Sequence, residues 1–83
     1  MAYPPLKPLH PEGSLSGAEL RQLERATTML LTSSLLPGVR DSLKVRPDGT
    51  ILDGHHRIRV LRDRGVDVDA LPREIIIAGE DLE

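Results

Sequence analysis

The sequence predicts a small α+β (mixed α/β) domain in which a helix, a β-hairpin, a second helix and a strand follow an extended amino-terminal arm. A helix-capping signal at Ser16 precedes leucines at helical spacing. A short stretch that alternates apolar and polar residues precedes the turn sequence Pro47-Asp48-Gly49, and Thr50-Ile51-Leu52 follows it as the returning strand. Because a chain of 83 residues suits one domain, we expect an arm over residues 1–13 and a single domain over residues 14–83.

The arm is expected to be extended because it is rich in proline, with Pro4, Pro5, Pro8 and Pro11. Proline fixes φ and removes a backbone donor, which disfavours a helix. A short edge strand around residues 6–9 is compatible with this composition.

The first helix is expected over residues 17–32. Ser16 can cap the amide of Glu19, and the Glu19 side chain can reach back to Ser16, which is the capping-box pattern. The sequence Leu36-Pro37-Gly38 follows the helix and stops it. The expected buried side consists of residues at helical spacing, namely Leu20, Leu23, Thr27, Leu30 and Leu31.

The hairpin is expected over residues 43–52, where Leu43 and Val45 alternate with charged residues and Gly49 permits a positive φ. A second helix is expected to begin at Asp53 or Gly54 and to end at Gly65, which accepts the left-handed conformation after a helix. The stretch "REIIIAG" predicts a final strand. Its three consecutive isoleucines predict that both faces of this strand are covered.

Composition narrows the classes of protein that the chain can represent. Tyr3 is its single aromatic residue, so the core must be aliphatic. The chain has no cysteine, which excludes disulfides, thiolate metal sites and a cysteine nucleophile. No apolar run reaches membrane-spanning length and proline interrupts the amino terminus, so we expect a soluble, cytoplasmic protein with no membrane partner. The net charge of -2 does not indicate nucleic-acid binding.

The stretch "ILDGHHR", residues 51–57, concentrates chemistry where a strand is expected to meet the second helix. The first amides of a helix lack internal partners and carry partial positive charge, which favours an anion such as phosphate. Gly54 permits close approach to the backbone, and Arg57 can hold a phosphate by two parallel hydrogen bonds. Asp53 is expected first as the helix cap, with Mg²⁺ or a hydroxyl proton as a second role. Adjacent His55 and His56 lack the spacing of a zinc site, so the sequence specifies no metal ligand set.

The stretch "LKVRPDGTILDGHHRIRVLRDRGV" resembles the signature of the ParB/sulfiredoxin superfamily, with its DGHHR motif at a helix start. The resemblance implies that a phosphate or nucleotide binds there through Gly54, His55, His56 and Arg57. Sulfiredoxins need a cysteine near His55, so their activity is not implied. The chain ends at Glu83 without a DNA-reading helix-turn-helix, so we do not expect a complete partition protein.

Two branches of the superfamily fit the motif. One is the ParB-like nuclease domain of phage, plasmid and toxin contexts. The other is the free serine kinases, which are similar in carrying DGHHR and an acidic residue near a histidine. In this chain "LHPEG" offers His10 and Glu12. The resemblance thus implies Glu12 as a general base, Asp53 as a second carboxylate, and His55 and His56 as acid/base or phosphate-binding groups.

Three functions follow from these observations. The first is phosphate or nucleotide binding with Mg²⁺ and a nucleoside di- or triphosphate, coupled to phosphoryl or phosphodiester chemistry. The second is a non-enzymatic, nucleotide-responsive adapter that forms a homodimer or docks on a protein partner. The third and weakest is direct binding of nucleic acid through Arg57, Arg59, Arg62 and Arg64, which do not share one helix face.

Overall fold

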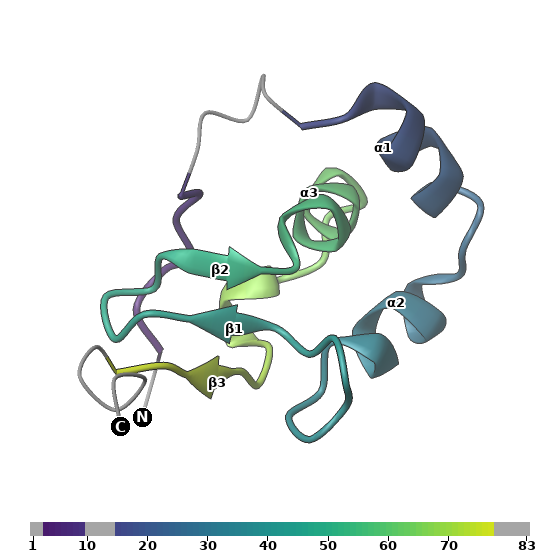
Figure 1. Cartoon of the computed structure of the whole chain (residues 1–83). Coiled ribbons are helices and arrows are strands. Elements are labelled where there is room, and N and C mark those ends of the chain that lie inside the picture. The colour runs from purple at the N-terminus through teal and green to yellow at the C-terminus, as the bar shows by residue number, and fades with distance from the viewer. Residues whose placement is uncertain (1–2, 10–14, 78–83) are drawn as a thin grey trace.

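The structure is a computed structural model that describes residues 3–9 and 15–77, and it confirms the predicted mixed α+β class. Its sheet has the strand order β2-β1-β3 and packs beside helix α3, with α1 on the far side of α3 and α2 below α1 in the view of Figure 1. The elements in chain order are α1 (Gly17–Leu23), α2 (Thr28–Ser34), β1 (Lys44–Val45), β2 (Ile51–Asp53), α3 (His55–Asp63), the 3₁₀ turn η2 (Val68–Ala70) and β3 (Glu74–Ile75). No helix in this part of the chain is long and apolar enough to cross a membrane.

The predicted hairpin is confirmed. Strands β1 and β2 pair antiparallel, and Gly49 in the connecting turn has a φ of 95°. The arm lies along this hairpin, because Lys7 forms a parallel bridge with Thr50 and Leu6 is buried. A side chain at Gly49 would meet the carbonyl oxygen of Pro5 at 2.2 Å, so glycine is required where the arm crosses the turn.

The core is aliphatic, as predicted. Its buried members come from the arm, α2 and its C-cap, the hairpin and the residue before it, α3 and η2: Leu6, Leu31, Leu35, Leu43, Val45, Ile51, Ile58, Val60, Leu61 and Val68. Helix α3 ends as expected, since Gly65 has a φ of 85° and its amide donates to the Arg62 carbonyl. The Val66 amide donates to the Leu61 carbonyl, which completes a Schellman motif.

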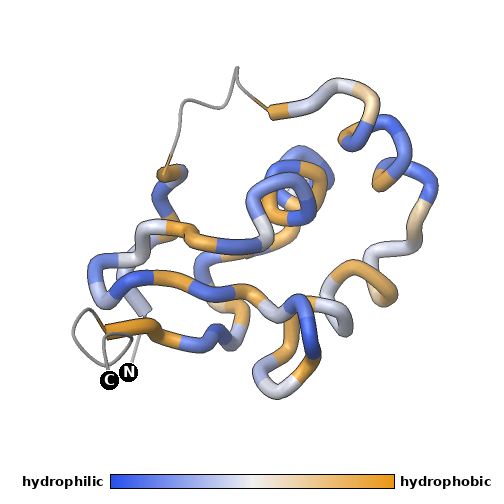
Figure 2. The backbone as a smooth tube through the Cα atoms, viewed as in Figure 1, coloured by the Kyte–Doolittle hydropathy of each residue, from blue (hydrophilic) through white to orange (hydrophobic). Residues whose placement is uncertain are grey.

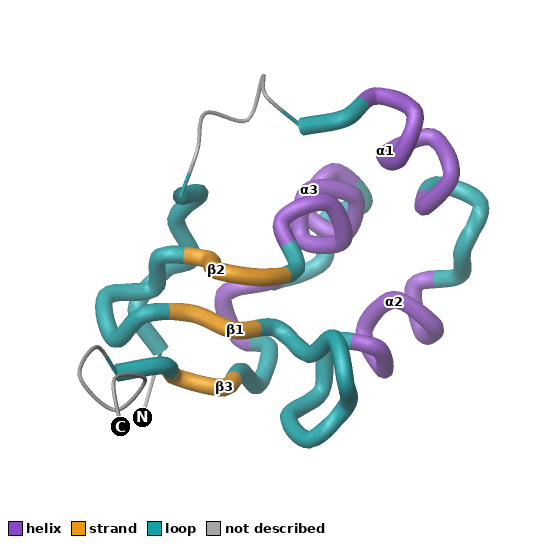
Figure 3. The backbone as a smooth tube through the Cα atoms, viewed as in Figure 1, coloured by secondary structure: helices purple, strands orange, loops and turns teal. Residues whose placement is uncertain are grey.

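The prediction of one helix over residues 17–32 is wrong, because the chain leaves the helix between α1 and α2 (Figure 3). Thr27 is extended, with φ and ψ of -72° and 155°, and its hydroxyl caps the Leu30 amide. The Arg64 guanidinium donates to the carbonyls of Glu24 and Ala26 at 3.0 and 2.8 Å. The break is therefore stabilised by a threonine cap from within and by an arginine from α3.

The prediction that the last strand is covered on both faces is also wrong. Strand β3 spans two residues at one edge of the sheet, paired parallel with β1 alone. Ile75 and Ile77 are 46% and 48% exposed. The Glu74 carboxylate accepts hydrogen bonds from the Ser42 hydroxyl and the Gly38 amide, and both bonds lower its pKa. The isoleucines therefore lie at an edge of the sheet, where the hydrogen bonds of Glu74 attach β3 to the segment before β1.

The buried side chain of Arg73 connects the amino-terminal arm with η2 through hydrogen bonds. Arg73 is 6% exposed, and it donates to the carbonyls of Pro4 and Asp69 at 3.0 and 2.7 Å. Its guanidinium carbon lies 4.3 Å from the centre of the Tyr3 ring, a cation–π distance. Burial lowers the pKa of Arg73. The one aromatic side chain of the protein is therefore engaged in this contact.

Candidate functional site

Gly54, and not Asp53, is the N-cap of α3, so the prediction that Asp53 caps the helix is wrong. Asp53 belongs to β2, whereas Gly54 has a φ of 107° and contributes no side chain to the cap. A Cβ at Gly54 would lie 3.1 Å from Leu35 Cδ2 and 3.4 Å from Leu43 Cδ1. Only glycine combines this φ with such close packing. The first bond of the helix runs from the Ile58 amide to the Gly54 carbonyl, so the amides before Ile58 have no partner within the helix.

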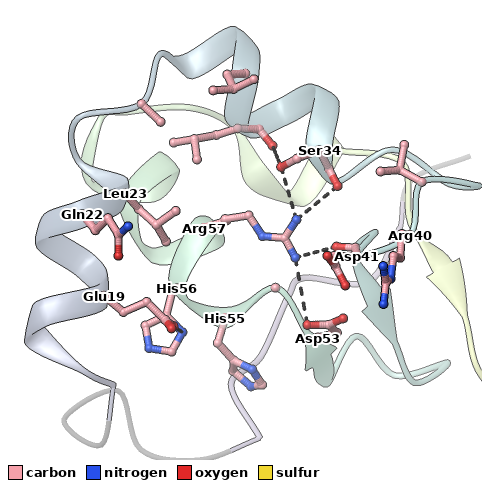
Figure 4. Close-up of a pocket in the computed structure, with 15 residues that line it drawn as sticks. Glu19, Gln22, Leu23, Ser34, Arg40, Asp41, Asp53, His55, His56 and Arg57 are labelled. Carbon is pink, nitrogen blue, oxygen red and sulfur yellow. Dashed lines mark hydrogen bonds and ion pairs between the residues drawn. The ribbon is translucent and has the colours of Figure 1, made fainter.

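The start of α3 forms one wall of a pocket of about 600 Å³. The five consecutive residues 53–57 all line it, which groups the predicted site residues that the structure describes (Figure 4). Helices α1 and α2 and the loop before β1 form the other walls. These walls contribute Glu19, Gln22, Leu23, Ala26, Leu30, Leu31, Ser34, Val39, Arg40 and Asp41.

Arg57 lies at the centre of the pocket wall and is already bound to protein atoms (Figure 4). Its Nη1 donates to the Ser34 carbonyl and hydroxyl at 3.1 and 3.2 Å, and its Nη2 donates to the Asp41 carbonyl at 2.5 Å. Nη2 also lies 4.0 Å from Asp53 Oδ1. Its side chain is 15% exposed. Arg57 therefore joins α2, the loop and β2, and its charge is fixed in place at the pocket surface.

The two histidines contact the chain on either side of residues 10–14. His56 Nε2 accepts from the Ser16 amide at 3.2 Å, and its Nδ1 lies 2.7 Å from Glu19 Oε2. His55 Nε2 accepts from the Leu9 amide at 3.3 Å. The capping box is thus half confirmed: Ser16 Oγ accepts from the Glu19 amide at 3.3 Å, but the Ser16 amide turns to His56 and the Glu19 carboxylate pairs with the same ring.

These contacts define the tautomer of a neutral His56 ring. An Nε2 that accepts an amide hydrogen carries no proton, so the proton of neutral His56 sits on Nδ1 and points to Glu19. Each histidine therefore presents a ring nitrogen that is occupied by a backbone amide. This arrangement positions the amino-terminal segment against α3.

The remaining charges of the pocket are Arg40, Asp41 and Asp53. Arg40 is exposed, and Asp53 is half-buried with a 48% exposed side chain. With the histidines neutral, the described pocket lining carries the positive charges of Arg40 and Arg57 against the negative charges of Glu19, Asp41 and Asp53. Within residues 3–9 and 15–77, no three His, Cys, Asp or Glu side chains form a metal-binding group.

Glu12, the predicted general base, and the nearby His10 lie outside the described residues. Arg40, Asp41 and Ser34 were not predicted as site residues. Ser34 ends α2 and the other two residues lie in the turn before the hairpin, and each reaches the site only through the fold, 16 to 23 residues from Arg57 in sequence. The weak prediction of a nucleic-acid surface loses part of its basis, since Arg57 and Arg64 bind backbone carbonyls and Arg59 pairs with Asp63.

No family model, no curated protein and no solved structure matches the chain. The resemblance to the ParB/sulfiredoxin superfamily accordingly stays a prediction from the motif.

Proposed function

We propose that the chain is a binding module for a phosphate-bearing ligand, held with Mg²⁺ at the start of α3. One observation carries the proposal: residues 53–57, Arg40 and Asp41 line a single pocket of about 600 Å³. This volume is within the range of roughly 300–1,000 Å³ that is typical of small-molecule sites. The amides of the first turn of α3 supply donors for phosphate oxygens, and the positive charge of Arg57, whose Nη atoms bind Ser34 and Asp41, adds electrostatic attraction.

The charge balance favours a metal-bound phosphate over a bare one. Three carboxylates against two guanidinium groups leave the described lining net negative by one, which opposes an anion on its own. Mg²⁺ binds to proteins through one or two carboxylates and takes its other ligands from phosphate oxygens and water. Asp53 and Asp41 are the carboxylates that would hold it. The ion would neutralise phosphate charge beside them.

The geometry supports binding more strongly than turnover. The Nε2 atoms of His55 and His56 are occupied by the Leu9 and Ser16 amides, which leaves those nitrogens unsuited to proton transfer in this arrangement. Of the three functions expected from the sequence, the proposal therefore corresponds to the second, the non-enzymatic adapter that responds to a nucleotide. Nuclease or kinase activity is a prediction of the resemblance, with Glu12, Asp53, His55 and His56 as its candidate catalytic residues.

Isothermal calorimetry tests the proposal with ATP, ADP, CTP and inorganic phosphate, each with MgCl₂ and again with EDTA. We expect binding that needs Mg²⁺ and that Asp53→Asn abolishes. Arg40→Ala is expected to weaken it by about 1.5 kcal/mol, roughly tenfold, the lower end for a bond to a charged group. Arg46→Ala, an exposed arginine at the hairpin turn, is the matched control.

Two results would contradict the proposal. One is a failure of every phosphate compound to bind in the presence of Mg²⁺. The other is an equal loss of affinity in Arg40→Ala and Arg46→Ala, because a site outside the pocket would then account for the binding.

A further inference from the structure

Part of the pocket lining is apolar and offers no hydrogen-bond donor to a phosphate group. Leu23 and Ala26 come from α1 and the break after it, Leu30 and Leu31 from α2, and Val39 from the turn that follows α2. The break separates α1 from α2 (Figure 3), and residues of both helices line the pocket at the start of α3. The apolar wall therefore depends on the helix break.

The core does not cover this wall. Leu30 is 62% exposed and Val39 is 42% exposed, whereas neighbouring Leu31 is 3% exposed. Part of α2 is coloured hydrophobic in Figure 2. Large apolar side chains that line a pocket and face water gain free energy when an apolar ligand covers them.

The wall is aliphatic throughout. No phenylalanine, tyrosine or tryptophan side chain lines the pocket in the part of the chain that the structure describes. Tyr3 packs on Arg73 elsewhere. A nucleobase is usually held by stacking on an aromatic ring. The aromatic rings of the described lining are the imidazoles of His55 and His56, and the Nε2 atom of each accepts a hydrogen bond from a backbone amide. An alkyl chain gains from contact with leucine and valine side chains without needing a flat partner.

We infer that the ligand of this pocket is an alkyl phosphate, whose phosphate group lies at the start of α3 and whose aliphatic chain covers the wall formed by Leu23, Leu30 and Val39. This inference rests on the proposed phosphate site. It replaces the nucleotide expected from the motif by a ligand with a single aliphatic chain.

Calorimetry with Mg²⁺ tests the inference by comparing inorganic phosphate, butyl phosphate, hexyl phosphate, octyl phosphate and ADP, each below the concentration at which it forms micelles. We expect the affinity to rise about fourfold for each methylene that becomes buried. Octyl phosphate is then expected to bind more tightly than ADP. 1-Octanol, which has the chain without the phosphate, is expected to bind far more weakly than octyl phosphate.

Two neighbouring residues of α2 give a matched pair of variants. Leu30 lines the pocket, whereas Met29, which is 78% exposed, does not. Leu30→Ser is expected to weaken octyl phosphate at least fivefold and to leave inorganic phosphate unchanged. Met29→Ser is expected to change neither affinity. Because both side chains are exposed, both variants are expected to fold.

The outcomes separate the inference from the proposed function. If inorganic phosphate binds but chain length adds no affinity, or if ADP binds more tightly than octyl phosphate, the inference is overturned and the phosphate site stands. Equal effects of Leu30→Ser and Met29→Ser would also overturn it, since the chain would then bind by general adsorption. If 1-octanol binds as well as octyl phosphate, or if no phosphate compound binds, the proposed function fails together with the inference.

Discussion

Replacing Arg57 by alanine tests how much this side chain stabilises the fold. The substitution removes the hydrogen bonds to the Ser34 carbonyl, the Ser34 hydroxyl and the Asp41 carbonyl. Ser34 is half-buried, so its carbonyl regains water only in part, whereas Asp41 is exposed and is rehydrated readily. A buried acceptor left without a donor costs about 1–3 kcal/mol.

From these contacts we expect Arg57→Ala to lower the free energy of unfolding by about 2–3 kcal/mol. A domain of this length is typically stable by about 4–12 kcal/mol, so the variant stays folded and its stability is measurable. At about 4–8 °C for each kcal/mol in a domain of this size, the melting temperature is expected to fall by roughly 10–20 °C. Urea denaturation followed by far-ultraviolet circular dichroism measures the free energy directly.

Two further variants control this experiment. Arg57→Lys keeps the charge but offers a single ammonium group, which cannot bridge Ser34 and Asp41 as the planar guanidinium does, so it is expected to restore less than half of the loss. Arg46→Ala removes an exposed arginine and is expected to change the stability by less than about 0.5 kcal/mol. If Arg57→Ala unfolds at the same urea concentration as Arg46→Ala, the structural role is refuted.

Three more predictions concern the frame of the site. Gly54→Ala is expected to lower the free energy of unfolding by about 1–3 kcal/mol, because the new Cβ is strained at a φ of 107° and presses on Leu35; a urea midpoint unchanged from wild type would contradict this. Thr27→Ala is expected to cost about 1 kcal/mol by removing the cap of α2, and a Thr27→Ser variant with the same loss would show that the hydroxyl is not responsible. The folded-state pKa of Glu74 lies below its usual 4.5 because the Ser42 hydroxyl and a backbone amide bind the carboxylate, so its stabilising contribution is present above pH 4.5 and is lost as the pH falls through the lowered pKa. Urea midpoints of wild type and Glu74→Gln between pH 6 and 3 measure this, and the difference between the two proteins is expected to shrink on acidification.

Local sequence signals predicted the parts of the fold that local interactions determine. The hairpin turn at Gly49, the end of α3 at Gly65 and the Ser16 cap each depend on one residue type at one backbone position, and each is present. The break between α1 and α2 could not be read from leucine spacing, because leucines occur at helical intervals on both sides of it. It is stabilised by the Thr27 cap and by Arg64, whose guanidinium reaches the Glu24 carbonyl across 40 residues of sequence.

In the candidate site, too, the sequence predicted the local features but not the long-range contacts. The motif predicted that residues 53–57 would gather at a helix start, and they do line one pocket. It could not show that Arg57 spends its donors on Ser34 and Asp41, or that the His55 and His56 rings accept backbone amides. Those partners lie 16 to 46 residues away in sequence, so their identity follows from the tertiary fold and not from a local pattern.

The most direct test of the account is a ¹H–¹⁵N correlation spectrum of the protein titrated with octyl phosphate and, separately, with ADP, each in the presence of Mg²⁺. The account predicts saturable shifts of the amides of residues 54–57 with both ligands, since both carry phosphate to the start of α3. It also predicts shifts at Leu30 and Val39 with octyl phosphate alone. Amides of residues 54–57 that stay unshifted at saturating concentrations of both ligands would contradict the central claim that the start of α3 binds phosphate.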